Sequence, residues 1–89
     1  MRRLFNPGQI VATRGALNLY ERGEDLLGYM VRHLSGDWGD LADEDKQENE
    51  FSMKNGFRIL SAYITSSGKL WIITEADRSA TTFLLPEEY

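Results

Sequence analysis

The feature that most constrains the fold is the period of two in the apolar residues of the C-terminal third. FRILSAYIT (57–65) and KLWIITEAD (69–77) flank the turn residues SSG, a pattern that predicts a β-hairpin. TTFLLP (81–86) follows the turn segment DRSA and predicts a third strand. Both faces of these strands carry apolar side chains, so one covering layer does not bury them. We expect helices on one face and the chain termini or a partner on the other.

The N-terminal part predicts one strand and two helices. GQIVAT (8–13) is a β-branched run between turn residues, and Thr13 can then cap a short helix through RGALNLYER. EDLLGYMVRHLSG (24–36) is the clearest amphipathic helix of the chain. Its predicted apolar stripe consists of Leu26, Leu27, Met30, Val31 and Leu34.

A mostly polar helix is predicted within LADEDKQENEFSMKNG (41–56). Asp40 or Asp43 is the expected N-cap, Gly56 the expected stop, and Phe51 the one large apolar side chain available for burial. The acidic residues near its start suit the positive end of the helix dipole. We therefore expect this helix on the surface.

Together these elements predict an α+β fold in a single domain over residues 1–89. It has one N-terminal strand, two to three helices, and then a three-stranded antiparallel meander packed on the helices. The ends, residues 1–7 and 87–89, are expected to be frayed. The sequence leaves open whether the strand at Gln9–Thr13 joins the sheet.

Composition excludes several kinds of site. The chain has no cysteine, which excludes disulfides, thiolate nucleophiles and the usual structural zinc sites. No segment approaches the roughly 20 apolar residues of a membrane span, so we expect a cytoplasmic protein without membrane contact. The net charge of −4 opposes binding to nucleic acid by charge alone.

Four carboxylates are the strongest candidates for chemistry. Asp37 and Asp40 lie in GDWGDL, and Glu75 and Asp77 end the strand segment KLWIITEAD. Carboxylate oxygens are the ligands that Mg²⁺ prefers, so a metal site is conceivable if the four converge. The same positions also suit helix caps and Asx turns, which is the interpretation we favour. We therefore predict no catalytic residue, no metal and no cofactor.

Arg78 and Trp38 complete the candidate binding residues. The planar guanidinium of Arg78 suits a carboxylate or phosphate, although a salt bridge across the hairpin end is the commoner arrangement. Trp38, between two glycines, is expected to insert into the core, with an exposed partner anchor as the alternative. For His33, the sole histidine, we expect a role in stability rather than catalysis.

Four strings, GQIVATRGAL, HLSGDWGDL, ILSAY and WIITEADRSATTFLLPEEY, cover most of the chain. As a set they resemble a family of small uncharacterised bacterial proteins, often labelled plasmid-related or as a restriction-system subunit. The chain has Arg14 where we expect proline in that family. The resemblance implies a mobile-element neighbourhood and supplies no catalytic residues.

Three functions stay open at this point. The favoured one is a small non-catalytic interaction or regulatory protein that binds another protein through its acidic helix or a sheet edge; a homodimer is also open. The second is a metal-assisted hydrolase that uses the four carboxylates, with Arg78 on an anionic substrate. The third is a nucleic-acid-binding accessory protein, which requires the early arginines to cluster on one face. Those arginines are Arg2, Arg3, Arg14, Arg22 and Arg32.

Overall fold

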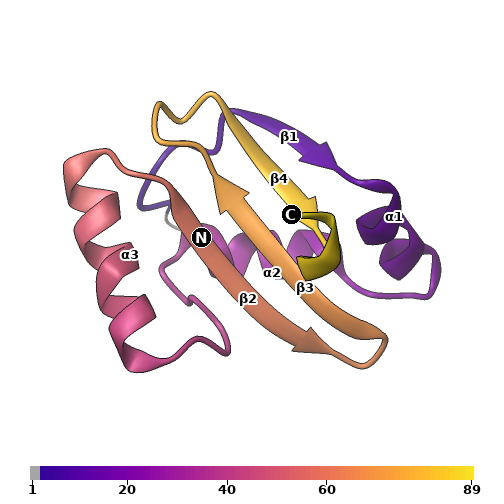
Figure 1. The fold of residues 1–89 in the computed structure, drawn as a ribbon. Coiled ribbons are helices and arrows are strands. Elements are labelled where there is room, and N and C mark those ends of the chain that lie inside the picture. The colour runs from indigo at the N-terminus through magenta and orange to yellow at the C-terminus, as the bar shows by residue number, and fades with distance from the viewer. Residues whose placement is uncertain (1–2) are drawn as a thin grey trace.

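The computed structural model describes residues 3–89 and has the predicted α+β class (Figure 1). The elements in chain order are β1 (Gln9–Ala12), α1 (Arg14–Glu21), α2 (Leu26–Leu34), α3 (Asp43–Asn55), β2 (Ile59–Thr65), β3 (Gly68–Thr74), β4 (Ala80–Leu84) and the 3-10 turn η1 (Pro86–Glu88). One N-terminal strand, three helices and then a three-stranded antiparallel meander are thus confirmed. Residues 1–2 of the predicted frayed start lie outside the described residues.

The N-terminal strand does join the sheet, which has the order β1-β4-β3-β2. β1 lies parallel to β4, with Ile10 opposite Thr81, and the other two strand pairs are antiparallel. A parallel neighbour needs a long crossover, and here α1, α2, α3 and the β2–β3 hairpin supply it. β1 and β2 are therefore the two edges.

One face of the sheet, here called the inner face, packs on α1 and α2 (Figure 1). From Ile59 of β2 to Phe83 of β4 its side chains are almost completely buried, as the period of two predicts for a covered face, whereas Ile10 of the edge strand β1 is 50% exposed. The buried residues of this face are Ile59, Ser61, Tyr63, Thr65, Leu70, Ile72, Thr74, Thr81 and Phe83. Ala16 and Leu19 of α1, with Leu26, Met30 and Leu34 of α2, complete the core.

The predicted apolar stripe of α2 needs a correction. Leu27 is 76% exposed and Val31 is 40% exposed, whereas the fully buried His33 takes a place among the core residues. A helix turns one stripe of about a third of its circumference toward a flat sheet, and Leu27 and Val31 lie outside the stripe through Met30 and Leu34. A histidine fits that stripe here because polar inner-face side chains meet both of its ring nitrogens.

The other face of the sheet, here called the outer face, is only partly covered. Ile73 and Leu84 are buried there, but Ile64 is 67% exposed and Trp71 is half-buried. η1 contacts β3, and the ring of Tyr89 packs edge-on against Trp71 with centroids 5.8 Å apart. The C-terminal segment thus covers the centre of this face, as expected, and leaves the part around Ile64 open; Trp71 is less buried than Trp38.

Both ends of the described chain contact the rest of the protein. The Leu4 N–H donates to the carbonyl of Leu34 at 2.9 Å, so the start is tied to the end of α2. At the other end, the Glu88 carboxylate accepts the Thr13 hydroxyl at 2.5 Å and the Gly15 N–H at 3.0 Å. Glu88 thereby supplies an acceptor to the N-terminus of α1, where N–H groups lack helical partners.

α3 begins between the two predicted starts, because its N-cap is Ala42 and neither Asp40 nor Asp43 caps it with a side chain. Gly56 ends the helix in the left-handed conformation with φ of 75°, as predicted. Phe51 is 55% exposed and stacks on Phe57 at 5.8 Å instead of entering the core. The helix is thus held at the surface, as its polar sequence predicts.

Candidate functional site: the edge and outer face of the sheet

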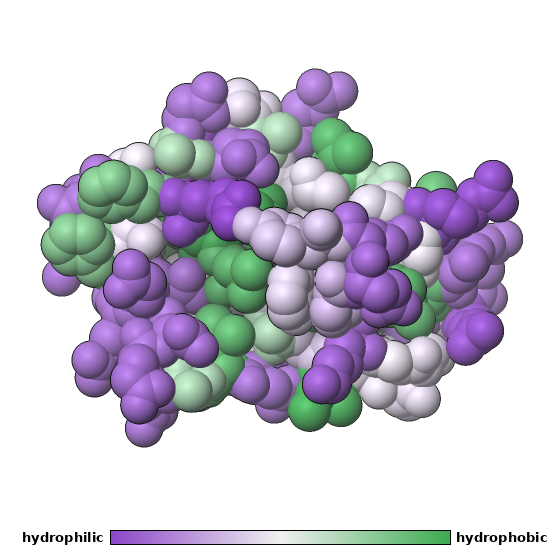
Figure 2. All heavy atoms as spheres, in the orientation of Figure 1, coloured by the Kyte–Doolittle hydropathy of each residue, from purple (hydrophilic) through white to green (hydrophobic). Residues whose placement is uncertain are grey.

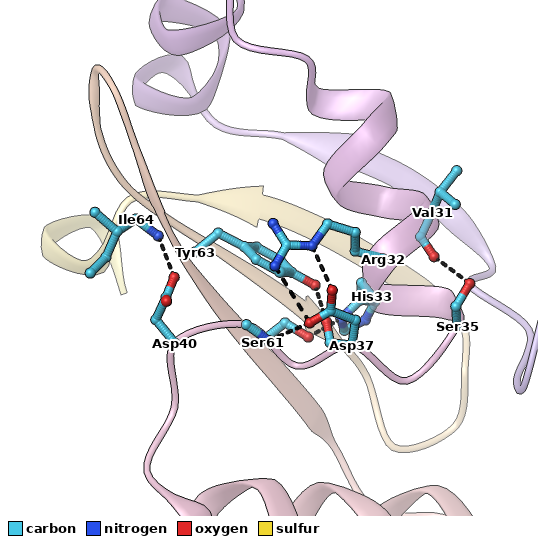
Figure 3. A network of polar contacts seen from close by, with 10 residues as sticks. Val31, Arg32, His33, Ser35, Asp37, Asp40, Ser61, Tyr63 and Ile64 are labelled. Carbon is cyan, nitrogen blue, oxygen red and sulfur yellow. Dashed lines mark hydrogen bonds and ion pairs between the residues drawn. The ribbon is translucent and has the colours of Figure 1, made fainter.

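The GDWGDL segment covers the free edge of β2 and does not form an acidic site (Figure 3). The Ala62 N–H donates to the carbonyl of Trp38 at 3.2 Å, and the Asp40 N–H donates to the carbonyl of Ala62 at 2.7 Å. The Asp40 carboxylate accepts the Ile64 N–H at 2.8 Å. Asp40 is therefore bound to the sheet edge, which explains why it does not cap α3.

Asn49 of α3 covers the same edge one step further along. Its side-chain amide donates to the carbonyl of Leu60 at 2.6 Å and accepts the Leu60 N–H at 3.2 Å. An exposed edge strand is a template for pairing with other chains, and the bonds from Asn49 and from GDWGDL occupy the edge of β2 and so block such pairing. The opposite edge strand, β1, has four residues, and short edge strands also resist pairing. Binding through a sheet edge is thus disfavoured.

The glycine before Asp40 is required by this close approach. Gly39 has φ of 80°, and a Cβ at that position would lie 2.0 Å from the carbonyl oxygen of Ala62. The preceding Trp38 is 4% exposed, and its indole N–H donates to Glu50 at 2.7 Å. Trp38 therefore inserts into the protein as predicted.

Asp37 is part of a local network with Arg32 (Figure 3). Its carboxylate lies 2.7 Å from the Arg32 guanidinium and also accepts the Gly39 N–H at 3.2 Å. The hydrogen bond from Arg32 lowers the pKa of Asp37. Both side chains are about half exposed, so the pair contributes little to stability. The main-chain carbonyl of Asp37 accepts the hydroxyl of Tyr63 at 2.6 Å, which joins the segment to the inner face.

Glu75 and Asp77 belong to the turn between β3 and β4. The Arg78 N–H donates to the carbonyl of Glu75 at 2.9 Å, and the Asp77 carboxylate accepts the Ser79 N–H at 3.0 Å. Hydrogen bonds from Ser79 lower the pKa of Asp77. This is the Asx-turn arrangement that the sequence favoured.

Arg78 holds the same turn against α3. Its guanidinium donates to main-chain carbonyls of four residues at 2.7 to 3.2 Å, and no carboxylate accepts from it within residues 3–89. The acceptors are Ser52, Phe57, Glu75 and Ala76. Arg78 also adopts φ of 60°, rare for a residue with a Cβ. Main-chain carbonyls thus take the place of the predicted salt bridge.

The four carboxylates do not converge. Asp40 binds at Ile64, whereas Glu75 follows Thr74, whose partner Ile59 begins β2. Those two ends of β2 are separated by five residues, or roughly 17 Å at the rise of a strand. Within residues 3–89, no three His, Asp or Glu side chains lie close enough to hold one metal ion.

His33 lies at the centre of a buried polar chain. Its Nδ1 is 2.6 Å from the Ser61 hydroxyl and its Nε2 is 2.9 Å from the Thr74 hydroxyl. Thr74 is 2.7 Å from Thr81, whose hydroxyl donates to the carbonyl of Pro7 at 2.7 Å. Because the Pro7 carbonyl can only accept, the Thr81 hydroxyl donates to it and accepts the hydroxyl of Thr74. The Thr74 hydroxyl in turn accepts the Nε2–H of His33. The Nδ1 of the neutral ring then accepts the Ser61 hydroxyl.

Burial lowers the pKa of His33 to about 3. Serine beside histidine is also the pairing that activates a nucleophile. Here both side chains have 0% exposure, and neither lines any of four surface hollows found among residues 3–89. The chain of hydrogen bonds therefore satisfies buried polar groups.

A groove runs along the outer face between α3 and β3, and here it is called the outer-face groove (Figure 2). It consists of two hollows of about 360 and 210 Å³ that share Trp71. The first is lined by Leu41, Asp45, Glu48, Asn49, Arg58, Leu60 and Trp71, and the second by Asp40, Ala62, Tyr63, Ile64, Lys69 and Trp71. Figure 2 shows apolar atoms in the middle of this face with hydrophilic atoms around them.

Most of the groove was not predicted as a site from sequence. Of its lining residues, the candidate binding residues included Asp40 alone, although the favoured function already placed binding on the acidic helix that contributes Asp45 and Glu48. The alternation of Leu60, Ala62 and Ile64 did place these residues on one face, but the sequence left open whether the chain termini or a partner covers that face. The missing information is that η1 is too short to cover it.

A third hollow of about 270 Å³ lies between α1, the β2–β3 turn and the C-terminal segment. Arg22, Lys69 and Glu87 contribute opposite charges to it. No aromatic residue lines it. It offers no apolar surface comparable to Trp71, so the outer-face groove is the stronger candidate for recognition.

Comparison with protein-family models, with curated proteins and with solved structures gives no match for this chain. The family resemblance noted in the sequence therefore stays a prediction. None of the helices formed by residues 3–89 combines the length and apolar character that crossing a bilayer requires.

Proposed function

We propose that this protein is a non-catalytic interaction protein that binds another protein through the outer-face groove. The observation that carries the proposal is the half-buried Trp71 at the junction of the two hollows, with apolar side chains on either side. Tryptophan is enriched among residues that dominate binding energies, because it buries a large area and keeps a polar N–H.

The fold does not need this groove for its core. The inner face already buries the main apolar cluster against α1 and α2. Leu60, Ala62 and Ile64 lie together on the outer face, and Ile64 is 67% exposed. Scattered apolar residues are ordinary on a surface, but a row of them in a hollow is typical of a recognition site.

The other two functions have less support. A metal-assisted hydrolase draws none from its four carboxylates, which hold turns and a strand edge at separate places. Nucleic-acid binding needs free arginines on one face, and Arg32 is paired with Asp37. We also propose the setting that the family resemblance implies, a cytoplasmic regulator in a mobile-element neighbourhood.

Site-specific photo-crosslinking tests the proposed function. A benzophenone amino acid replaces Ile64 in the groove and, in a matched control, Leu27 on α2, since both are highly exposed and apolar. In cells that make the protein, we expect a discrete crosslinked band from position 64 and none from position 27. The proposal is wrong if position 64 gives no adduct, or if both positions give the same one. An adduct of twice the protein's mass would identify a homodimer instead.

A further inference from the structure

We infer that the occupant of the outer-face groove is an extended peptide segment of the partner that alternates apolar with lysine or arginine side chains. This inference rests on the proposed function and names the chemistry that the groove recognises. It follows from the charges on the wall of the groove, the apolar floor and the length of β2.

The wall that α3 contributes is acidic. Asp45 and Glu48 are three residues apart, so they lie on the same side of the helix, and both line the groove. Within residues 3–89 the one ion pair is Arg32–Asp37, so neither of these two carboxylates has a cationic partner. Cations on the bound segment would complement this wall, and an acidic segment would be repelled by it.

The cations of the groove lie near its two ends. Lys69 is opposite Ile64, beside the hairpin turn. Arg58 precedes the start of β2, where its guanidinium donates to the Tyr89 hydroxyl and lies 5.2 Å from the centre of that ring. Between them, the side facing α3 is acidic and the floor is apolar.

The floor sets the shape of the occupant. From Leu60 to Ile64 the strand spans roughly 13 Å, which accommodates about four residues of an extended chain. In an extended chain, side chains alternate in direction, so one set contacts Leu60 and Trp71 while the other points toward α3 or solvent. Alternating apolar and basic residues therefore match floor and wall together.

Defined peptides test this inference. The probes are blocked ten-residue peptides: one alternates lysine with leucine, a second has glutamate for lysine, and a third has serine for leucine. Binding is followed from the backbone amide and indole N–H signals in NMR spectra of the ¹⁵N-labelled protein. We expect the first peptide to shift signals of Leu60, Trp71 and Asp45. The other two should bind at least about ten-fold more weakly, since each lacks one of the two complementary features.

A matched pair of variants tests whether the acidic wall of the groove contributes to peptide binding. Asp45→Asn with Glu48→Gln removes the two groove carboxylates, and Glu21→Gln with Glu44→Gln removes two exposed carboxylates outside the groove. We expect the first double variant to weaken binding of the lysine-leucine peptide by about 2- to 30-fold, and the control to leave it unchanged. Added salt should weaken binding to the native protein more than binding to the first variant.

The inference is overturned if the glutamate peptide binds as well as the lysine peptide, if the groove variant binds like the control, or if no peptide shifts groove signals. Crosslinking at Ile64 combined with any of these results would leave the proposed function standing and remove only the peptide chemistry. Loss of both the crosslink and peptide binding would remove both.

Discussion

Between about pH 7.5 and about pH 5, acidification should destabilise this protein mainly through His33. His33 is the sole histidine, and folding lowers its pKa from 6.5 to about 3 by burial. The unfolded chain therefore binds a proton that the folded protein rejects at pH values between these two. By linkage, the contribution of the neutral His33 to stability is full above about pH 6.5 and is lost as the pH falls toward 3.

The expected magnitude follows from one proton. Each pH unit below the unfolded pKa costs up to about 1.4 kcal/mol of unfolding free energy. Between about pH 7.5 and about pH 5 the sum is about 2 kcal/mol, a large part of the stability of a small domain. The carboxylates whose pKa folding lowers contribute little in that interval, because they are largely ionised in the unfolded chain above about pH 5 and lose stability mainly below it.

Urea unfolding at the two pH values measures this difference directly. His33→Gln is the control, because glutamine can still hydrogen bond at this site and does not titrate. If the variant folds, its unfolding free energy should change by less than about 0.5 kcal/mol between the same pH values. In parallel, NMR of the folded native protein should show an Nε2–H tautomer that does not titrate above about pH 4.

The reasoning is refuted if the native protein is equally stable at both pH values, or if the folded imidazole titrates near its ordinary pKa. A slope that persists unchanged in His33→Gln would assign the effect to another group. An Nδ1–H tautomer would refute the direction of the hydrogen-bond chain, since that direction depends on the carbonyl of Pro7 as its final acceptor.

Three further changes test how the turns and the covered edge are held. Gly39→Ala should lower the unfolding free energy by more than about 2 kcal/mol, because the new Cβ meets the Ala62 carbonyl. The control Gly23→Ala should cost only about 1 kcal/mol, because Gly23 has φ of 98° but no atom within 4 Å of the new Cβ. Equal losses in urea unfolding would contradict the close approach at Gly39. Arg78→Ala should lose about 2 kcal/mol with the guanidinium contacts to four carbonyls, and the exposed Arg22→Ala serves as the control; a loss no larger than the control's would show that these contacts are unimportant. Asp40→Ala should cost about 1 kcal/mol and, by freeing the Ile64 N–H, increase self-association in light scattering; a variant as monodisperse as the native protein would mean that the edge needs no cover.

These contacts change the interpretation of GDWGDL. Both of its aspartates have structural contacts, because the Asp40 carboxylate binds the edge of β2 and the Asp37 carboxylate binds Arg32. The segment instead lets a small sheet end without an open edge. The proposed recognition therefore uses the outer face, where Trp71 and the wall of α3 meet.

The sequence by itself determined the local structure. A period of two placed β2 and β3, the amphipathic stretch placed α2, and Gly56 ended α3, because side-chain spacing and glycine conformation act within a few residues. The inward position of Trp38 also followed from its neighbours. The sorting of the strand residues into two faces was correct for the same reason.

Only the tertiary structure decided which polar groups meet. Aspartate is a typical N-cap residue, yet the Asp40 carboxylate accepts the N–H of Ile64, 24 positions further along the chain. His33 could be buried only because Ser61 and Thr74, which are distant in sequence, both face its ring. The groove exists because η1 covers just part of the outer face. Such contacts depend on how separate elements pack, and a local pattern of residues does not encode that.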